Sequence, residues 1–295
     1  MNTSIPICDY EGSRYAVEFW SRERRYEDLA ERVALKKILP PGGKRLIEIG
    51  AGAGRLADLY AGYEEVILTD YARSVLKEAH QRWGSDARFR FVEADVYRLP
   101  FVPGAFDAVV MVRVMHHLAE VEQALAQVVS VLREEATLVI EYANKCHLKA
   151  IARWLLRRQA WSPFDRQPYE FARLNFDFHP AWMTGRLRQA GLSITRELGV
   201  SYFRMDWLKR AVAPHLLAAA DGLLQGSARW WKVSPSVFVQ ARLAPGASDR
   251  PAETVSDQLF KCPACGTALV ESKPVIVCPR CRQSYPLVDG VYVFK

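Results

Sequence analysis

The stretch RLIEIGAGAGRLADLY, residues 45–60, decides the fold of this chain. An apolar run is followed by glycines at alternate positions and then by a helical pattern. This order is typical of a β-strand that turns into an α-helix around a nucleotide-like cofactor. A dinucleotide fingerprint needs a glycine where Arg55 stands, and a P-loop needs a Gly-Lys pair followed by Ser or Thr. Neither pattern is present, so phosphate binding at this turn is disfavoured.

Short apolar runs alternate with helical patterns on both sides of this stretch. We expect a helix at 179–190 and others beginning at 53, 71 and 119. Alternation of this kind predicts βαβ units and a parallel sheet covered on both faces. The predicted strands are KRLIEIG (44–50), EEVILTD (64–70), RFRFVEAD (88–95), FDAVVMVRV (106–114), ATLVIEYA (136–143), LSITRELGVSYF (192–203) and SPSVFVQARL (234–243).

Four motifs in this region resemble those of class I S-adenosylmethionine-dependent methyltransferases. The first is E-x-G-x-G-x-G, from Glu48 to Gly54, and the second is VILTD, which ends at Asp70. The third is EADVYRLPF, with Asp95, and the fourth is FDAVVMVRVMHHLAEVEQAL, from residue 106. The resemblance covers about residues 40–242. It implies an α/β, Rossmann-like fold with a seven-stranded methyltransferase sheet and helices on both faces.

The resemblance also implies S-adenosylmethionine as the cofactor and a set of residues around it. The glycine backbone makes room for the methionine part, Asp70 bonds the ribose, and Asp95 with the amide of Val96 bonds the adenine. Two carboxylate oxygens match two adjacent hydroxyl donors, which suits this role for Asp70. The expected cofactor-binding residues are Glu48, Gly50, Ala51, Gly52, Gly54, Asp70, Tyr71, Asp95, Val96 and Arg113. The alternative is a Rossmann-like domain that binds another nucleotide.

Two adjacent histidines, His116 and His117, are the candidates for a catalytic base. Methyl transfer from a sulfonium is mainly a matter of positioning, but a base helps when the acceptor carries a proton. The ordinary pKa of histidine suits that task. His117 is favoured because the last histidine of the pattern is the one that the resemblance carries. The alternative is that one of them caps the loop or packs against the sheet.

The segment of about residues 1–40 is expected to form a lid over the cofactor. Residues 8–27 hold Tyr10, Tyr15, Phe19, Trp20 and Tyr26, and aromatic faces suit a sulfonium cation. The alternative is that these aromatic side chains pack a helix onto the sheet.

Residues 145–158, KCHLKAIARWLLRR, contain no acidic residue. Lys145, Lys149, Arg153 and Arg157 recur every fourth position, which predicts one basic stripe on a helix. Such a stripe suits an anionic membrane surface or RNA, although it is also compatible with a solvated helix face.

The segment at 206–226 inserts an apolar helix that can cover an acceptor pocket or touch lipid. LNFDFHP, residues 174–180, lies near the same region of the chain. It adds Asn175, Asp177 and His179 as candidates on the substrate side.

The end of the chain predicts a small metal-binding β domain. Residues 243–258 have the composition of a linker, and residues 259–295 hold Cys262, Cys265, Cys278 and Cys281 as two CxxC pairs. Four thiolates suit a structural, tetrahedral Zn²⁺ site, with iron as the minor alternative. The ending YPLVDGV resembles the methyltransferase-activator zinc ribbons, which are partners of methyltransferases of tRNA, ribosomal RNA and release factors. The ribbon is near neutral once a metal is counted, so we expect it to pack against the domain of residues 1–242.

The predicted function is methyl transfer from S-adenosylmethionine to a small-molecule or lipid-like acceptor. One alternative is a methyltransferase of RNA or a translation factor, and another is a non-catalytic S-adenosylmethionine-binding adaptor protein. The formal charge of +7 permits an acidic partner without requiring one. The sequence shows neither a secretory signal pattern nor an apolar run of membrane-spanning length, so a cytoplasmic location is expected.

Overall fold

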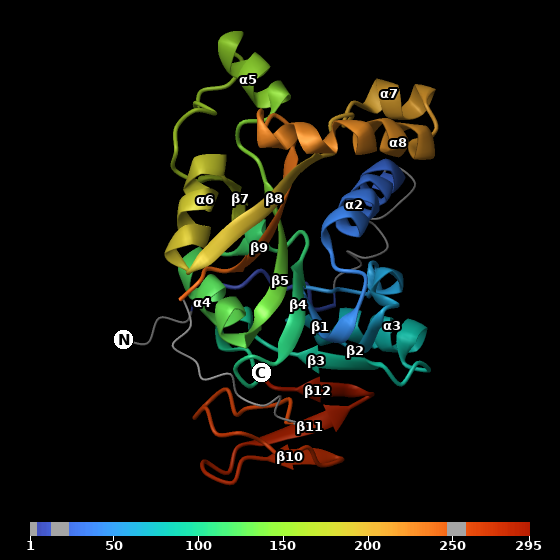
Figure 1. The fold of residues 1–295 in the computed structure, drawn as a ribbon, viewed down its shortest axis with the longest axis vertical. Coiled ribbons are helices and arrows are strands. Elements are labelled where there is room, and N and C mark those ends of the chain that lie inside the picture. Colours follow the sequence, from blue (N-terminus) through green and yellow to red (C-terminus); the bar gives the residue numbers. More distant parts are fainter. Residues whose placement is uncertain (1–4, 13–23, 247–257) are drawn as a thin grey trace.

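The structure is a computed structural model that describes residues 5–12, 24–246 and 258–295 (Figure 1). Of the aromatic residues expected in a lid, Tyr15, Phe19 and Trp20 lie outside these ranges, as does most of the expected linker.

The described chain is built on one ten-stranded sheet in the order β10-β11-β12-β3-β2-β1-β4-β5-β9-β8. Strands β1 to β5 are parallel where they pair, while β9 runs antiparallel to both β5 and β8. The strands up to β9 are β1 Gly43–Ile49, β2 Tyr63–Asp70, β3 Phe89–Glu93, β4 Phe106–Met111, β5 Leu132–Ala143, β8 Leu192–Val200 and β9 Ser236–Leu243. A separate two-stranded sheet is formed by β6 Tyr169–Ala172 and β7 Asn175–Asp177.

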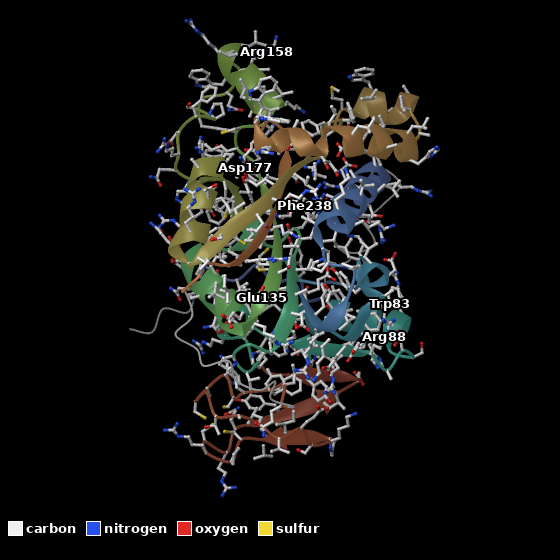
Figure 2. The ribbon with its side chains drawn as sticks, in the orientation of Figure 1. Trp83, Arg88, Glu135, Arg158, Asp177 and Phe238 are labelled. Atoms are coloured by element: carbon white, nitrogen blue, oxygen red, sulfur yellow. The ribbon has the colours of Figure 1, made fainter. Side chains whose placement is uncertain are left out.

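Helices cover both faces of the large sheet, because successive residues of the central strands point to opposite sides. Leu46 packs with helices α2 and α3 on one face, whereas Ile47 packs with α4 on the other. Figure 2 shows the side chain of Phe238, from β9, in the middle of the molecule. The helices are α2 Arg25–Ile38, α3 Arg73–Trp83, α4 Val121–Val131, α5 Leu148–Leu155, α6 Pro180–Gln189, α7 Asp206–Ala211 and α8 Pro214–Leu224.

The expected α/β, Rossmann-like architecture is confirmed, with two corrections. The C-terminal segment, expected as a separate small domain, adds β10 Val275–Val277, β11 Ser284–Val288 and β12 Val291–Val293 to the seven strands of residues 43–243, so the sheet has ten strands. The helix expected from residue 53 is a short 3₁₀ turn, η2 Ala57–Tyr60. Gly52 and Gly54 both have positive φ, so the chain cannot enter a right-handed helix before residue 55.

The C-terminal segment continues the sheet at its β3 edge. Strand β12 pairs in parallel with β3, and the Phe294 amide donates to the Glu93 carbonyl at 2.9 Å. Nearby, the Val102 amide donates to the Leu259 carbonyl, and the ring of Phe260 lies 5.9 Å from that of Phe101. An open edge strand exposes unpaired backbone groups, so this pairing covers an edge that would otherwise be open.

We predict that Phe260→Ala lowers the stability of the whole described fold. Phe260 is buried and packs against Phe101, and removing such a ring costs about 3–5 kcal/mol of unfolding free energy. The measurement is chemical denaturation followed by far-ultraviolet circular dichroism. The control is Val270→Ala, because Val270 is exposed in the same segment. An unchanged transition in the Phe260 variant would show that the segment contributes nothing to the fold.

Candidate functional site

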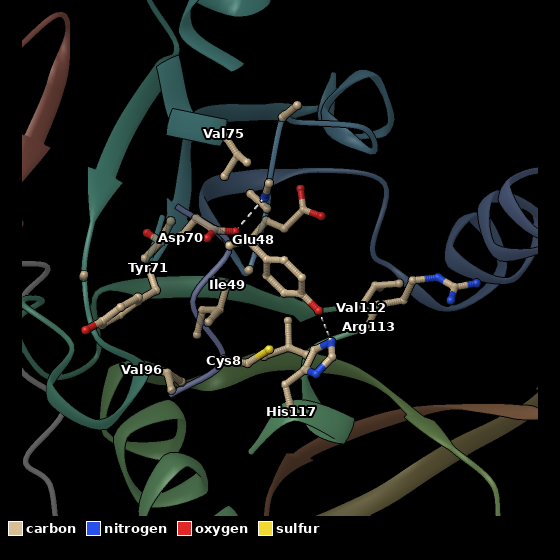
Figure 3. Close-up of a pocket in the computed structure, with 18 of the residues that line it drawn as sticks. Cys8, Glu48, Ile49, Asp70, Tyr71, Val75, Val96, Val112, Arg113 and His117 are labelled. Atoms are coloured by element: carbon tan, nitrogen blue, oxygen red, sulfur yellow. Dashed lines mark hydrogen bonds between the residues drawn. The ribbon is translucent and has the colours of Figure 1, made fainter. Parts of the chain in front are cut away.

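A cavity of about 470 Å³ opens at the carboxyl ends of strands β1, β2 and β4 (Figure 3). The chain passes from β1 to β2 and β3 on one side and to β4 and β5 on the other. This reversal leaves a crevice where open α/β sheets bind their ligands. Ile7, Cys8 and Tyr10, from the first described segment, also line the cavity.

The glycine turn after β1 forms one wall of the cavity. The amides of Gly50 and Ala51 donate to the Thr69 carbonyl at 2.7 and 3.0 Å, which holds the turn against the end of β2. A side chain at Gly50 would meet Val114, whereas one at Gly52 would meet no protein atom within 4 Å. The space beside Gly52 is therefore room left for a ligand.

Gly54 does not line the cavity, although the sequence pattern grouped it with Gly50 and Gly52. A side chain there would approach the Trp83 ring at 3.0 Å, and the Trp83 indole donates to the Gly54 carbonyl at 3.0 Å. This glycine therefore allows α3 to pack closely against the turn.

Two carboxyl groups, the half-buried Asp70 and the buried Glu48, lie in the cavity wall. Asp70 accepts from the Gly52 amide at 2.8 Å (Figure 3). It also accepts from the Ala72 amide at 3.0 Å. Burial raises the pKa of Asp70, and these amides oppose the rise. Each carboxylate oxygen has a second lone pair, so Asp70 still has capacity to accept from two hydroxyls.

Burial raises the pKa of Glu48 to about 8. Its Oε2 atom, like Oγ1 of Thr69, is buried and has no hydrogen-bond partner within the described part of the chain. Glu48 and Thr69 both line the cavity, so these two atoms can bond polar groups of a ligand there. A ligand ammonium beside Glu48 would favour the ionised carboxylate.

The opposite wall follows β3. Asp95 caps the 3₁₀ turn η3 Val96–Arg98 by accepting from the Tyr97 amide at 2.8 Å. Val96 and Tyr71 also line the cavity, so Asp95, Val96 and Tyr71 lie together as the sequence motifs predicted.

Arg113 reaches the cavity in an unusual backbone conformation, with φ of 62°. Its amide donates to Glu141 at 2.9 Å, and its guanidinium is paired with the buried Glu31 of α2. Arg55 pairs with the same carboxylate at 2.7 Å. Burial raises the pKa of Glu31, but the two arginines outweigh it and hold that pKa below its ordinary value.

Sequence reasoning missed Glu31. The available signal was its position four residues after Glu27 on the face of α2 that also buries Ala30 and Ala34.

His117 faces the cavity, whereas His116 does not line it. His117 Nδ1 lies 3.0 Å from the Leu174 carbonyl. Its Nε2 lies 3.0 Å from the Tyr10 hydroxyl, which is the contact dashed at His117 in Figure 3. A carbonyl only accepts, so Nδ1 carries the proton and the Nε2 lone pair is directed toward Tyr10. Burial lowers the pKa of His117, which keeps the ring neutral. The ring of His116 packs against the ring of His117, with 4.0 Å between their centroids. Burial, together with the neighbouring His117, lowers the pKa of His116 well below its ordinary value.

The predicted basic stripe is wrong. Lys145 precedes helix α5 and is buried, with its ammonium donating to the carbonyls of Asp165 and Gln167 at 3.0 and 2.7 Å. The helix begins at Leu148 because His147 caps it by accepting from the Ala150 amide, and Arg157 lies after its end with φ of 55°. Lys149, Arg153 and Arg157 therefore do not form one helical row with Lys145.

The three substrate-side candidates do not line the cavity. Asn175 and Asp177 belong to β7, and burial raises the pKa of Asp177 to about 6. His179 caps helix α6 by accepting from the Ala181 amide, so it has a structural role.

The sulfur atoms of Cys262, Cys265, Cys278 and Cys281 all lie within 4.8 Å of one another. Two of the sulfur pairs, 262–281 and 265–278, are 3.5 Å apart. Four thiolates at this spacing fit around one tetrahedral ion, and a closed set of four cysteines is a structural type of site.

Comparison with known proteins places these features in a family. A family model described as "Methyltransferase domain" matches residues 47–140. Demethylmenaquinone methyltransferase of Clavibacter sepedonicus is 32% identical over 111 residues, which is 37% of this chain and 45% of that protein. The enzyme of the same name from Thermus thermophilus is 35% identical over 115 residues, 37% of this chain and 51% of that protein. The chain thus spans about half the length of the curated relatives it matches.

Among solved structures, a complex between the Haloferax volcanii Trm112 methyltransferase activator and a methyltransferase superposes with a TM-score of 0.55. The match has 16% sequence identity and covers 79% of this chain and 96% of that chain, which supports the fold alone. Within the described residues, no helix has the length and apolar character needed to cross a membrane. The motif order, the cavity at the switch in strand order and these matches agree that residues 47–140 are similar to the methyltransferase domain family.

Proposed function

We propose that this chain transfers the methyl group of S-adenosylmethionine to a small-molecule or lipid-like acceptor. The observation that carries the proposal is the cavity beside Gly52, which is bordered by Asp70 and by the unpartnered Oε2 of Glu48. The relatives named demethylmenaquinone methyltransferases support a quinone as one acceptor to test. The most direct test is formation of S-adenosylhomocysteine with a demethylated quinone.

The cofactor supplies an electrophilic methyl group on a sulfonium. In our proposal Glu48 receives the ammonium of the methionine part, and the open space beside Gly52 receives its chain. Asp70 accepts from the ribose hydroxyls while the Gly52 and Ala72 amides hold its carboxylate in place. Asp95 and the Val96 amide receive the adenine. Arg113 acts as a positioning residue, because its side chain is committed to Glu31.

His117 is the proposed base for a proton of the acceptor. Its Nε2 lone pair faces the cavity, and the Leu174 carbonyl fixes the tautomer through Nδ1. In this structure the Tyr10 hydroxyl is hydrogen-bonded to Nε2 of His117 at 3.0 Å. An acceptor must therefore displace the Tyr10 hydroxyl, or the proton of the acceptor must pass through that hydroxyl to His117. His116 supports the ring of His117 and takes no proton in this scheme.

The domain boundaries belong to the proposal: a methyltransferase domain at 1–242, a linker at 243–258 and a zinc ribbon at 259–295. The cysteine geometry supports Zn²⁺, and the pairing of β12 with β3 supports a stabilising role for the ribbon. A second candidate function, methylation of RNA or a translation factor, is favoured by one observation. The superposed Haloferax volcanii structure contains a methyltransferase activator, and the ribbon resembles such activators.

Asp70→Ala is expected to weaken binding of S-adenosylmethionine about tenfold to a hundredfold, because a hydrogen bond to a charged group contributes roughly 1.5–3 kcal/mol. Isothermal titration calorimetry measures the dissociation constant. Asp86→Ala is the matched control, since Asp86 lies on the surface and pairs only locally with Arg88. Equal affinity in the two variants would remove Asp70 from the cofactor site.

His117→Gln is expected to lower kcat by a factor of about 10² to 10⁴. The neutral ring is the active form, so activity should fall as the pH drops through the pKa of His117. Because burial lowers that pKa, the acidic limb of the wild-type profile should lie below pH 6.5, the usual value for histidine. His215→Gln, at an exposed position of α8, is the control. An acidic limb that persists unchanged in the His117 variant would exclude this residue as the base.

The purified chain is expected to contain about one zinc ion, held by its four clustered cysteines. Elemental analysis measures the metal, and Cys278→Ser should remove it while Cys146→Ser leaves it in place. A zinc content that is the same in both variants would contradict the site.

A further inference from the structure

One end of the molecule exposes large apolar side chains to an extent not found elsewhere in the described residues. The described residues expose fifteen large hydrophobic side chains, and thirteen of them come from residues 148–231. The highest exposed fractions are 89% for Leu223 and 74% for both Trp230 and Trp231. Extended apolar surfaces on a protein mark places where something binds.

These side chains belong to elements that adjoin one another. Helix α8 passes directly into the 3₁₀ turn η5 Gln225–Arg229, and the two tryptophans follow it. The Leu148 amide then donates to the Val233 carbonyl at 2.9 Å, which ties the start of α5 to the chain just after the tryptophans. In Figure 1, α5, α7 and α8 lie at the same end of the molecule, opposite the C-terminal strands. We call this surface the apolar face and define it by Leu155, Leu156, Trp207, Leu223, Trp230 and Trp231.

The two segments that form the apolar face have a net positive charge. Residues 148–164 contain four lysines and arginines and no acid, and residues 205–232 contain four more against two aspartates. These two segments therefore have a net charge of +6, against +7 for the whole chain. One of the two aspartates, Asp221, is buried and accepts from the Tyr26 hydroxyl at 2.6 Å.

Most of these cations are available to a partner. Lys209 and Lys232 pair with Glu27 and Glu197 at 3.0 and 2.9 Å. The described residues form no ion pair with the other six. Five of these are exposed, namely Lys149, Arg157, Arg158, Arg210 and Arg229, whereas Arg153 is half-buried. Arg158 lies at the outer end of the molecule, beyond α5 (Figure 2).

The apolar face lies at the edge of the sheet that holds the cofactor cavity. Helix α5 follows the carboxyl end of β5, and the loop after the neighbouring strand β4 carries His117. A surface docked on this face would thus approach the side of the sheet from which an acceptor must enter.

We propose that the apolar face docks onto a lipid bilayer that contains anionic headgroups. Exposed tryptophans with leucines bury into the interfacial region, and the surrounding arginines and lysines attract anionic lipid. The proposal rests on the proposed function, which it deepens by placing the acceptor in a membrane. The unpaired cations argue for lipid headgroups over an apolar protein partner, whose interface core would be depleted of charge.

The test is co-sedimentation of the full chain with vesicles of phosphatidylglycerol and phosphatidylcholine in equal parts. The chain should bind these vesicles and bind vesicles of phosphatidylcholine alone much more weakly. A double variant, Trp230→Ser with Trp231→Ser, should weaken binding roughly tenfold or more, because two exposed aromatic anchors are lost. A second double variant, Arg157→Glu with Arg158→Glu, should weaken binding by at least as much and make it less sensitive to salt.

The control is Val270→Ser with Val277→Ser, which changes the two exposed large apolar side chains of the described residues that lie outside residues 148–231. Its vesicle binding should equal that of the wild type. Calorimetry with S-adenosylmethionine shows whether each variant is folded. If the tryptophan variant does not fold, the arginine variant alone tests the proposal.

Three results would overturn the proposal. They are absence of vesicle binding by the wild type, equal binding by all variants, and a stable dimer in light scattering that disappears in the tryptophan variant. Vesicle binding requires no turnover, so failure of the membrane proposal is distinguishable from failure of methyl transfer.

Discussion

A single buried carboxylate, Glu31, joins the two loops that enclose the cofactor cavity. Arg55 follows the glycine turn after β1, and Arg113 follows β4, and both pair with Glu31 from helix α2. Removing one member of a buried ion group leaves the other charges uncompensated, which typically costs about 3–5 kcal/mol. The distance between the loops, and hence the width of the cavity, therefore depends on this helix and not on the sheet alone.

The sheet provides the second constraint. Parallel strands place all their carboxyl ends at one edge, so residues far apart in sequence meet there. Gly52 and Asp70 are joined by an amide–carboxylate bond of 2.8 Å across 18 positions of sequence. The same edge receives His117 and Tyr10, whose contact spans 107 positions. The cavity is thus assembled by the order of the strands, and each loop contributes only one or two groups.

The sequence was informative where the chemistry is local. The glycines with positive φ and the acidic residue that ends β2 belong to short sequence motifs that can be recognised without the structure. Asp70, Asp95 and Val96, which these motifs indicated, all line the cavity. The prediction of a basic stripe was wrong because the spacing of four residues begins at Lys145, before the helix starts. His147 caps the helix, so only residues from Leu148 to Leu155 are helical. Glu31 was missed because its partners come from loops distant in sequence, and burial against two arginines has no local signature.

The C-terminal segment shows the same limit at a larger scale. Its cysteine spacing predicts a metal cluster, and the four sulfur atoms do gather, but no local pattern indicates that β12 would join β3. That pairing brings Lys295 within 3.1 Å of the Tyr71 carbonyl and 3.2 Å of Glu93. Tyr71 borders the cofactor cavity, so covering the open edge of the sheet also fixes one wall of the site. The edge strand and the cavity wall are therefore stabilised by the same few residues, which links the fold of the C-terminal segment to the shape of the cavity.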